Sequence, residues 1–300
     1  MTDRPADHPI KCLQIWGGNR AIDSAISTPG VDLYLRSRVH DGDAAGGDIH
    51  YVSACAAGKV SRFVLADVAG HGSDAASFAA GLRRLMRKHI NTPDQSRLAR
   101  SLNDDLFAGA DARARFATAL LATYFAPTDH LILCNAGHPR PALRRAGAGA
   151  WSILTHDDYS PDVIARGDGP ANLPLGVIEP TEYHQFALPL EPGDLVLMYT
   201  DAVTESRDAS GHMLGEAGLL DILRSLDADR PETLLDAIES RLDDRSPGPP
   251  DDDRTILLLA HTASDPGPKP IGERVAMLGR LLGVTPDDAG DPSKHAPAPA

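Results

Sequence analysis

Apolar residues recur along most of the chain with the spacings of β-strands. Residues 31–39 alternate between apolar and polar side chains, whereas the runs 63–66 and 195–199 are continuously apolar. These patterns predict half-buried and fully buried strands, respectively. The strands expected on this basis lie near residues 31–39, 49–55, 62–67, 116–125, 130–134, 183–188, 194–200 and 255–261.

Helical spacing of apolar residues occurs between the predicted strands. Phe78, Ala79, Leu82 and Leu85 recur every three or four residues, as is typical of an amphipathic helix. Helices are expected near residues 74–90, 95–108, 216–226 and 231–243. Strands interrupted by paired helices predict an α+β layered sandwich.

The composition changes outside this patterned region. Residues 156–172 are polar and contain glycine and proline, which predicts a loop. Residues 263–300 predict a linker, a short amphipathic helix at 271–283 and a disordered Asp/Pro/Ala-rich tail. The expected organisation is an N-terminal extension over 1–30, one folded domain over 31–262 and this C-terminal segment.

Asp67 ends an apolar strand and precedes two glycines and a predicted helix. Gly70 and Gly72 allow tight backbone turns, and Ser73 is a favourable helix N-cap. A carboxylate fixed at the mouth of a sheet is well placed to hold a hard cation. The same pattern is common in α/β proteins, so an ordinary turn is the alternative interpretation.

Four acidic positions share this placement at the ends of apolar strands. Asp48 precedes an alternating strand, Asp201 follows an apolar run, and the pair Asp252 and Asp253 precedes the last run. Unpaired carboxylates that converge on one edge repel each other, and cations relieve that repulsion. Oxygen ligands favour Mg²⁺ or Mn²⁺ over zinc. The pattern therefore predicts a divalent-cation site, unless the acids are separate turn residues that never meet.

Two histidines, His71 and His138, lie in the glycine-containing segments AGHG and AGHP. Both could act as ligands or acid–base groups, because an unperturbed imidazole titrates near neutrality. Both could instead be turn histidines bonded to backbone groups, and the oxygen-rich set of acids favours this interpretation. His138 is kept as a candidate for protonating the leaving group.

The composition is that of an ordinary globular chain with a strongly acidic balance. The 300 residues include 42% hydrophobic residues, and the formal net charge is −13. This charge argues against binding to nucleic acid or to anionic membranes. No segment resembles a targeting signal, and no apolar run approaches the roughly 20 residues that span a bilayer. The three widely spaced cysteines are expected to be reduced, so a cytoplasmic location without membrane insertion is predicted.

Seven short motifs, in a fixed order, carry a specific resemblance. They span about residues 31–261 and read AGGD, ADVAGHG, FATALLATY, NAGHPRPAL, LPLGV, TDAVTE and DDRT. The set resembles the metal-dependent PPM, or PP2C-like, serine/threonine phosphatases and is most similar to their bacterial SpoIIE/RsbU-like branch. This resemblance implies the PPM α-β-β-α sandwich, in which helices flank two mostly antiparallel sheets. It also implies two bound ions, Mn²⁺ or Mg²⁺, and a flap over the site from residues 156–172.

The resemblance also implies roles for individual residues. The catalytic acids would be the same carboxylates that contact the two metals, and the backbone carbonyl of Val68 would help. The implied metal-contacting residues are Asp48, Asp67, Val68, Asp201 and either Asp252 or Asp253. Asp252 is preferred because it lies three residues before Thr255, as in the family's acid-x-x-Thr pattern, but the choice stays open.

Two positions depart from the family's pattern. Ala202 stands where glycine often follows the third acid, and Tyr51 stands where a second acid often follows the first. Neither change removes a principal ligand, but Tyr51 could weaken an outer-shell water contact. The phosphate-binding arginine of eukaryotic members has only positional candidates here, Arg20 and Arg36.

The favoured hypothesis is a protein phosphatase that hydrolyses phosphoserine or phosphothreonine by attack of metal-bound water, without a covalent phosphoenzyme. The resemblance implies bacterial partner-switching signalling. The substrate would then be a phosphorylated STAS-domain anti-sigma-factor antagonist, and a separate sensor protein would supply the input. The alternative is a catalytically weak PPM-fold module that binds and controls a signalling partner. Retention of all the principal acids favours catalysis.

Overall fold

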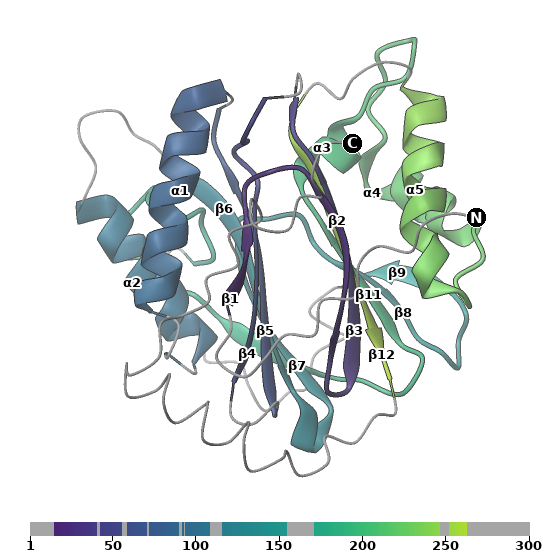
Figure 1. Cartoon of the computed structure of the whole chain (residues 1–300), viewed down its shortest axis with the longest axis horizontal. Coiled ribbons are helices and arrows are strands. Elements are labelled where there is room, and N and C mark those ends of the chain that lie inside the picture. Colours follow the sequence, from purple (N-terminus) through teal and green to yellow (C-terminus); the bar gives the residue numbers. More distant parts are fainter. Residues whose placement is uncertain are drawn as a thin grey trace, which may run out of the picture.

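The computed structural model describes residues 15–40, 43–55, 59–70, 72–89, 92, 94–108, 116–154, 171–246 and 252–262. Within these residues the chain forms two six-stranded sheets that pack face to face. Two helices cover the outer face of one sheet and three cover the other (Figure 1). The predicted α+β sandwich is thereby confirmed.

The first sheet has the strand order β1-β4-β5-β6-β7-β10, and every neighbouring pair is antiparallel. Its strands are β1 (Ile15–Gly18), β4 (Ile49–Cys55), β5 (Val60–Val68), β6 (Ala117–Phe125), β7 (His130–Ala136) and β10 (Gln185–Pro189). A short 3₁₀ helix, η3 (Ala126–Thr128), joins β6 to β7. The helices α1 (Gly72–Lys88) and α2 (Gln95–Ala108) pack on this sheet.

The second sheet has the order β2-β3-β12-β11-β8-β9 and is also antiparallel throughout. Its strands are β2 (Ile22–Thr28), β3 (Val31–Arg38), β12 (Arg254–His261), β11 (Leu195–Tyr199), β8 (Ala142–Arg144) and β9 (Trp151–Ile153). Its helices are α3 (Asp201–Glu205), α4 (Gly215–Arg224) and α5 (Pro231–Arg245).

Three apolar layers hold the sandwich together. The central layer lies between the sheets and includes Leu33, Leu65 and Leu257. The outer layers lie between each sheet and its helices; α1, for example, contributes Ala75, Ala79, Leu82 and Met86. Each fully buried large apolar side chain contributes about 1.5–3 kcal/mol. The strands are therefore rigid supports for the polar residues at their ends.

The helices and strands formed by long apolar runs were predicted well from the sequence. The helix expected at 95–108 spans Gln95–Ala108, and the final strand expected at 255–261 spans Arg254–His261. The short elements β8, β9 and α3 were not expected, because three to five residues show no clear periodicity.

The expected start of the folded domain at residue 31 is too late. β1 pairs with β4, and β2 pairs with β3, so residues 15–28 belong to the two sheets and not to an extension. The alternation of β2 is hidden because Ser24 and Thr28 occupy buried positions on its inward face. The Thr28 hydroxyl is satisfied there by donating to the carbonyl of Val31, at 3.1 Å.

Several expectations fall on other parts of the chain. The segment 263–300 and most of the predicted loop, 155–170, lie outside the described residues. Among the described helices, none is both long and apolar enough to cross a bilayer. Cys134 is a buried free thiol in β7.

Candidate metal centre

The predicted acids are carried by one edge of the sandwich. Asp48 immediately precedes β4, and Asp67 lies near the end of β5; Ile49 pairs with Ala66 across these two strands. In the second sheet, Asp201 begins α3 directly after β11, while Asp252 and Asp253 precede β12. Antiparallel pairing brings the end of one strand beside the start of the next. Within each sheet, acids far apart in the sequence therefore lie at neighbouring strand ends.

A chain of hydroxyl groups ties Asp48 to the second sheet. The Thr200 hydroxyl donates to Oδ2 of Asp48 at 2.9 Å and accepts the backbone N–H of Thr255, also at 2.9 Å. The hydroxyls of Thr255 and Ser37 are 2.8 Å apart. Oδ1 of Asp48 is buried and has no partner among the described residues. One carboxylate oxygen is thus held in place, and the other remains available to a ligand.

The acids are electrostatically strained. Burial, followed by the charges of Asp201 and Asp252, raises the pKa of Asp67 to about 8. Burial and then Asp67 raise the pKa of Asp48 well above its usual range, although hydrogen bonds from Thr255 and Thr200 oppose the shift. Burial also raises the pKa of Asp201, with Glu205 and Asp252 adding to the effect. Such carboxylates are stabilised by a proton or by a cation.

The candidate ligands are of the chemical type that binds hard cations, but they are not arranged as a coordination group. All the principal groups are oxygens, which Mg²⁺ and Mn²⁺ prefer. In the part of the chain that the structure describes, no three Asp, Glu, His or Cys side chains form a ready-made coordination group.

Asp252 and Asp253 have different surroundings. The carboxylate of Asp253 is buried and accepts the backbone N–H groups of His40 at 2.7 Å and Gly47 at 2.5 Å, one on each oxygen. A side chain at Gly46 would run into this carboxylate, which explains one glycine of the AGGD segment. Asp252 is half-buried, and its charge acts on both Asp67 and Asp201.

The glycine next to Asp48 keeps the carbonyl of Val68 approachable. A Cβ atom at Gly47 would lie 3.2 Å from the carbonyl oxygen of Val68 and 3.5 Å from that of Gly70. Gly70 and Gly72 adopt positive φ angles of 99° and 78°, which L side chains rarely tolerate. The turn into α1 thus depends on both glycines. His71, between them, lies outside the described residues.

His138 is buried within a hydrogen-bonded turn. Its backbone N–H donates to Oδ1 of Asn135 at 2.7 Å, and its carbonyl accepts from Nδ2 of the same residue at 2.8 Å. Its Nδ1 lies 2.8 Å from the hydroxyl of Thr118, the residue opposite Asp67 in the β5–β6 ladder. Burial lowers the pKa of His138 to about 3, so the imidazole is neutral near pH 7.

The remaining candidates are distributed as follows. Arg36 forms ion pairs with Asp23 and, at 2.7 Å, with Asp236 of α5, on the outer face of the second sheet. Arg20 is exposed in the turn after β1. Tyr51 is buried in the layer beneath α1. Sequence reasoning gave no role to Glu205, which stands one helical turn after Asp201 and adds to its electrostatic strain.

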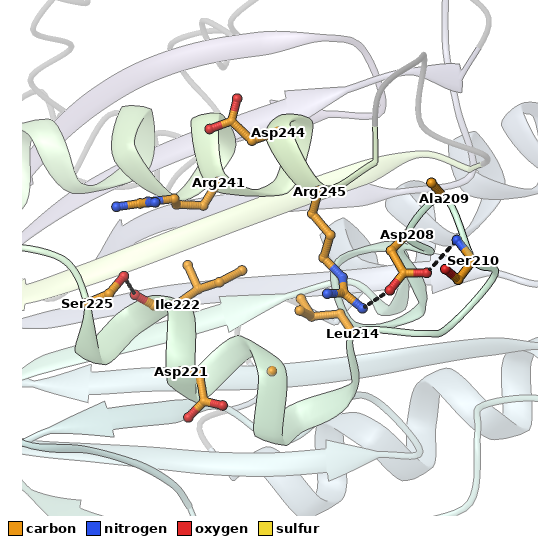
Figure 2. A pocket seen from close by; sticks show the side chains of 11 residues that line it. Asp208, Ala209, Ser210, Leu214, Asp221, Ile222, Ser225, Arg241, Asp244 and Arg245 are labelled. Carbon is orange, nitrogen blue, oxygen red and sulfur yellow. Dashed lines mark hydrogen bonds and ion pairs between the residues drawn. The ribbon is translucent and has the colours of Figure 1, made fainter.

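A cavity of about 700 Å³ lies between α4, α5 and the loop after α3 (Figure 2). Arg245 projects into it and bonds to Asp208 at 3.3 Å, while the other oxygen of Asp208 accepts the N–H groups of Ser210 and His212. None of the four principal acids lines this cavity. It is therefore distinct from the acidic edge described above.

Comparison with known proteins identifies the class. The family model described as Stage II sporulation protein E (SpoIIE) matches residues 57–262. The chain belongs to the SpoIIE family of PP2C-like domains, as its motifs indicate.

The chain resembles particular members over part of their length. It is 28% identical over 153 residues to the phosphoserine phosphatase RsbU of Bacillus subtilis (strain 168), covering 51% of this chain and 41% of RsbU. The crystal structure of the RsbU and RsbW domains of Rv1364c from Mycobacterium tuberculosis superposes with a TM-score of 0.64 at 23% identity. That match covers 85% of this chain and 64% of the other. The chain thus spans less than two thirds of either protein.

Two further structures with this fold contain metals. RsbX in complex with magnesium has a TM-score of 0.57 at 16% identity, covering 80% of this chain and 100% of that one. The catalytic domain of PstP in complex with two manganese ions has a TM-score of 0.51 at 19% identity, covering 77% and 98%. At these identities the likeness establishes a shared fold.

The raised pKa of Asp67 predicts a pH-dependent stability of the metal-free protein. The folded state holds this proton up to about pH 8, whereas an ordinary aspartate releases it near 3.8. The contribution of Asp67 to stability is therefore expected to fall as the pH rises from 3.8 to about 8 and to level off above that. Thermal melts in EDTA between pH 5 and 8 should show a steeper decline in the wild type than in Asp67→Asn. Parallel curves for the two proteins would contradict the assignment.

Proposed function

We propose that this chain is a divalent-cation-dependent protein phosphatase that hydrolyses phosphoserine and phosphothreonine. The observation that carries the proposal is the convergence of acids from both sheets on one edge of a SpoIIE-family domain. Carboxylates that raise each other's pKa suit a hard cation. The magnesium and manganese found in relatives with this fold support the same choice of metal.

Some residues of the chain would hold the cations, and Asp253 would position the loop that carries one of the ligands. Asp67, Asp201 and Asp252 would bind the cations through carboxylate oxygens, Asp48 through its unpartnered Oδ1, and Val68 through its carbonyl. When bound, two Mn²⁺ or Mg²⁺ ions would polarise the phosphoryl group and activate the attacking water. Asp253 would instead fix the loop before β4, because both of its oxygens already accept backbone N–H groups.

His138 is better suited to positioning than to proton transfer. A neutral imidazole has no surplus proton to give a leaving group near pH 7. Its contacts with Asn135 and Thr118 would brace the strand beside Asp67. Proton transfer to the leaving group would then fall to solvent.

We further propose that the substrate is a phosphorylated STAS-domain protein in a partner-switching pathway. The similarity to RsbU, a phosphoserine phosphatase, supports this choice. The experiment is to compare kcat/KM on purified phospho-STAS proteins with kcat/KM on unrelated phosphoserine and phosphotyrosine proteins. A clear preference for the phospho-STAS proteins is expected. Equal rates on all phosphoserine proteins would remove the partner-switching claim, and faster release from phosphotyrosine would remove the proposed substrate class.

Thr200 offers a test of how Asp48 is held. Thr200→Val removes the hydroxyl at similar volume, so Asp48 loses a donor and the Thr255 N–H loses its acceptor. Because outer-shell partners orient metal ligands, Mn²⁺ affinity is expected to fall about tenfold or more. Thr200→Ser keeps the hydroxyl and should bind Mn²⁺ nearly as the wild type does. Calorimetric titration of Mn²⁺ measures this, and a valine variant with wild-type affinity would contradict the role of the hydroxyl.

A further inference from the structure

Three arginines gather where α1 lies against the glycine end of β1. Arg83 and Arg87 stand one turn apart on α1, and Arg20 lies in the turn after β1. A Cβ atom at Gly18 would lie 4.0 Å from Nη1 of Arg83, so the guanidinium rests against the glycine end of β1. Burial lowers the pKa of Arg83, and repulsion from Arg87 and Arg20 adds to the effect. The charges of Arg87 and Arg20 therefore both act on Arg83.

No carboxylate neutralises this group in the part of the chain that the structure describes. The next basic residue of α1, Lys88, is paired with Asp105 at 2.8 Å, whereas Arg20, Arg83 and Arg87 form no ion pair there. Nε and Nη2 of Arg87 are buried without a hydrogen-bond acceptor. Buried guanidinium nitrogens ordinarily have an acceptor, so Arg87 lacks an anion among the described residues. This lack is notable in a chain of net charge −13.

The arginine cluster borders the loop that carries Asp48. Asn19, between Gly18 and Arg20, accepts the backbone N–H of Gly46 at 2.7 Å and donates through Nδ2 to the carbonyl of Gly46 at 2.9 Å. Its Nδ2 also lies 3.2 Å from the carbonyl of Ala76 in α1. In addition, Gly18 pairs with His50, two residues after Asp48. A protein bound at the acidic edge would therefore reach the turn that carries Arg20, and Arg83 lies against the glycine before that turn.

We propose that Arg20, Arg83 and Arg87 form an oxyanion subsite for an acidic residue next to the scissile phosphoserine. This inference rests on the proposed phosphatase function. Guanidinium groups bind carboxylate and phosphate oxygens through paired N–H donors. The subsite would give the acidic edge, which repels anions, a neighbouring region that attracts them. It would therefore select phosphoproteins by the charge beside the phosphoserine.

The kinetic test compares two phosphoserine peptides that differ only in flanking Glu or Gln. The full chain with Mn²⁺ is expected to favour the Glu peptide about tenfold in kcat/KM, as for the loss of one charged hydrogen bond. The double variant Arg83→Gln with Arg87→Gln should lose this preference and keep its rate on the Gln peptide. Arg84→Gln is the matched control, because Arg84 is exposed on the same helix. Equal wild-type rates on both peptides would overturn the subsite.

A binding test judges the subsite even if no turnover occurs. The Glu peptide with serine in place of phosphoserine is labelled and titrated with the full chain, and its anisotropy is recorded. Binding is expected to weaken about tenfold in the double variant and to stay unchanged in Arg84→Gln. Inorganic phosphate is added as a competitor. Equal weakening by Arg84→Gln would show a diffuse charge effect, and binding of phosphate without the peptide would show a free-anion site; either result overturns the proposal.

Discussion

Replacing Asp67 by asparagine is expected to lower turnover of a phosphoserine peptide about 100-fold or more. The substitution keeps the shape of the side chain but removes a charge that would hold the cations and stabilise the transition state. Asp48→Asn and Asp201→Asn should have effects of similar size, because these acids extend the same electrostatic cluster. Steady-state release of inorganic phosphate with Mn²⁺ measures all three.

The adjacent pair Asp252 and Asp253 supplies a matched comparison. Asp252→Asn should reduce turnover with little change in melting temperature. Asp253→Asn should mainly destabilise the fold, because the backbone N–H groups of His40 and Gly47 depend on its carboxylate. Wild-type turnover in any two of the variants of Asp48, Asp67 and Asp201 would contradict the metal assignment. The reverse pattern for the adjacent pair would reassign the ligand to Asp253.

Mn²⁺ is expected to stabilise the folded domain by a large margin. A ligand at 100 times its Kd adds about 2.7 kcal/mol to the unfolding free energy. For a domain of this size, that corresponds to a rise in Tm of about 5–10 °C. Scanning calorimetry over a Mn²⁺ series should show a rise that depends on concentration.

The Asp67→Asn variant and the wild type should exchange their order of melting temperature when Mn²⁺ is added. Without metal, the variant should melt higher than the wild type near pH 8, because it lacks a buried charge that its neighbours repel. With Mn²⁺ it should melt lower, because it has lost a ligand. Arg84→Gln, an exposed change on α1, serves as a control and should follow the wild type. If the wild type shows no shift up to millimolar Mn²⁺, the clustered acids do not form a useful cation site.

Long apolar runs in the sequence predicted the strands and helices that they form in the structure. Runs such as the one before Asp201 locate a strand and its end, so acids at strand ends could be predicted. β2 was not predicted because its buried face contains two polar residues, Ser24 and Thr28. Periodicity reports only the polarity of positions. It therefore cannot predict that tertiary contacts bury a particular polar residue.

Contacts between residues far apart in the sequence distinguish candidates that the sequence pattern could not tell apart. The choice between Asp252 and Asp253 depends on N–H groups more than 200 residues away, at His40 and Gly47. Likewise, Arg20 was only a positional candidate, and the approach of Arg83 to Gly18 places a second arginine near the same turn. The fold determines these neighbours, and no local motif encodes them.

Phosphate release from a single phosphoserine peptide, measured with the purified chain before and after Mn²⁺ replaces EDTA, tests whether this chain is a metal-dependent phosphatase. We expect no release above background in EDTA and many turnovers per chain with Mn²⁺. Equal release under both conditions would contradict the metal-dependent mechanism. No release with Mn²⁺, from a chain shown by calorimetry to bind the ion, would contradict catalysis and favour a regulatory binding module.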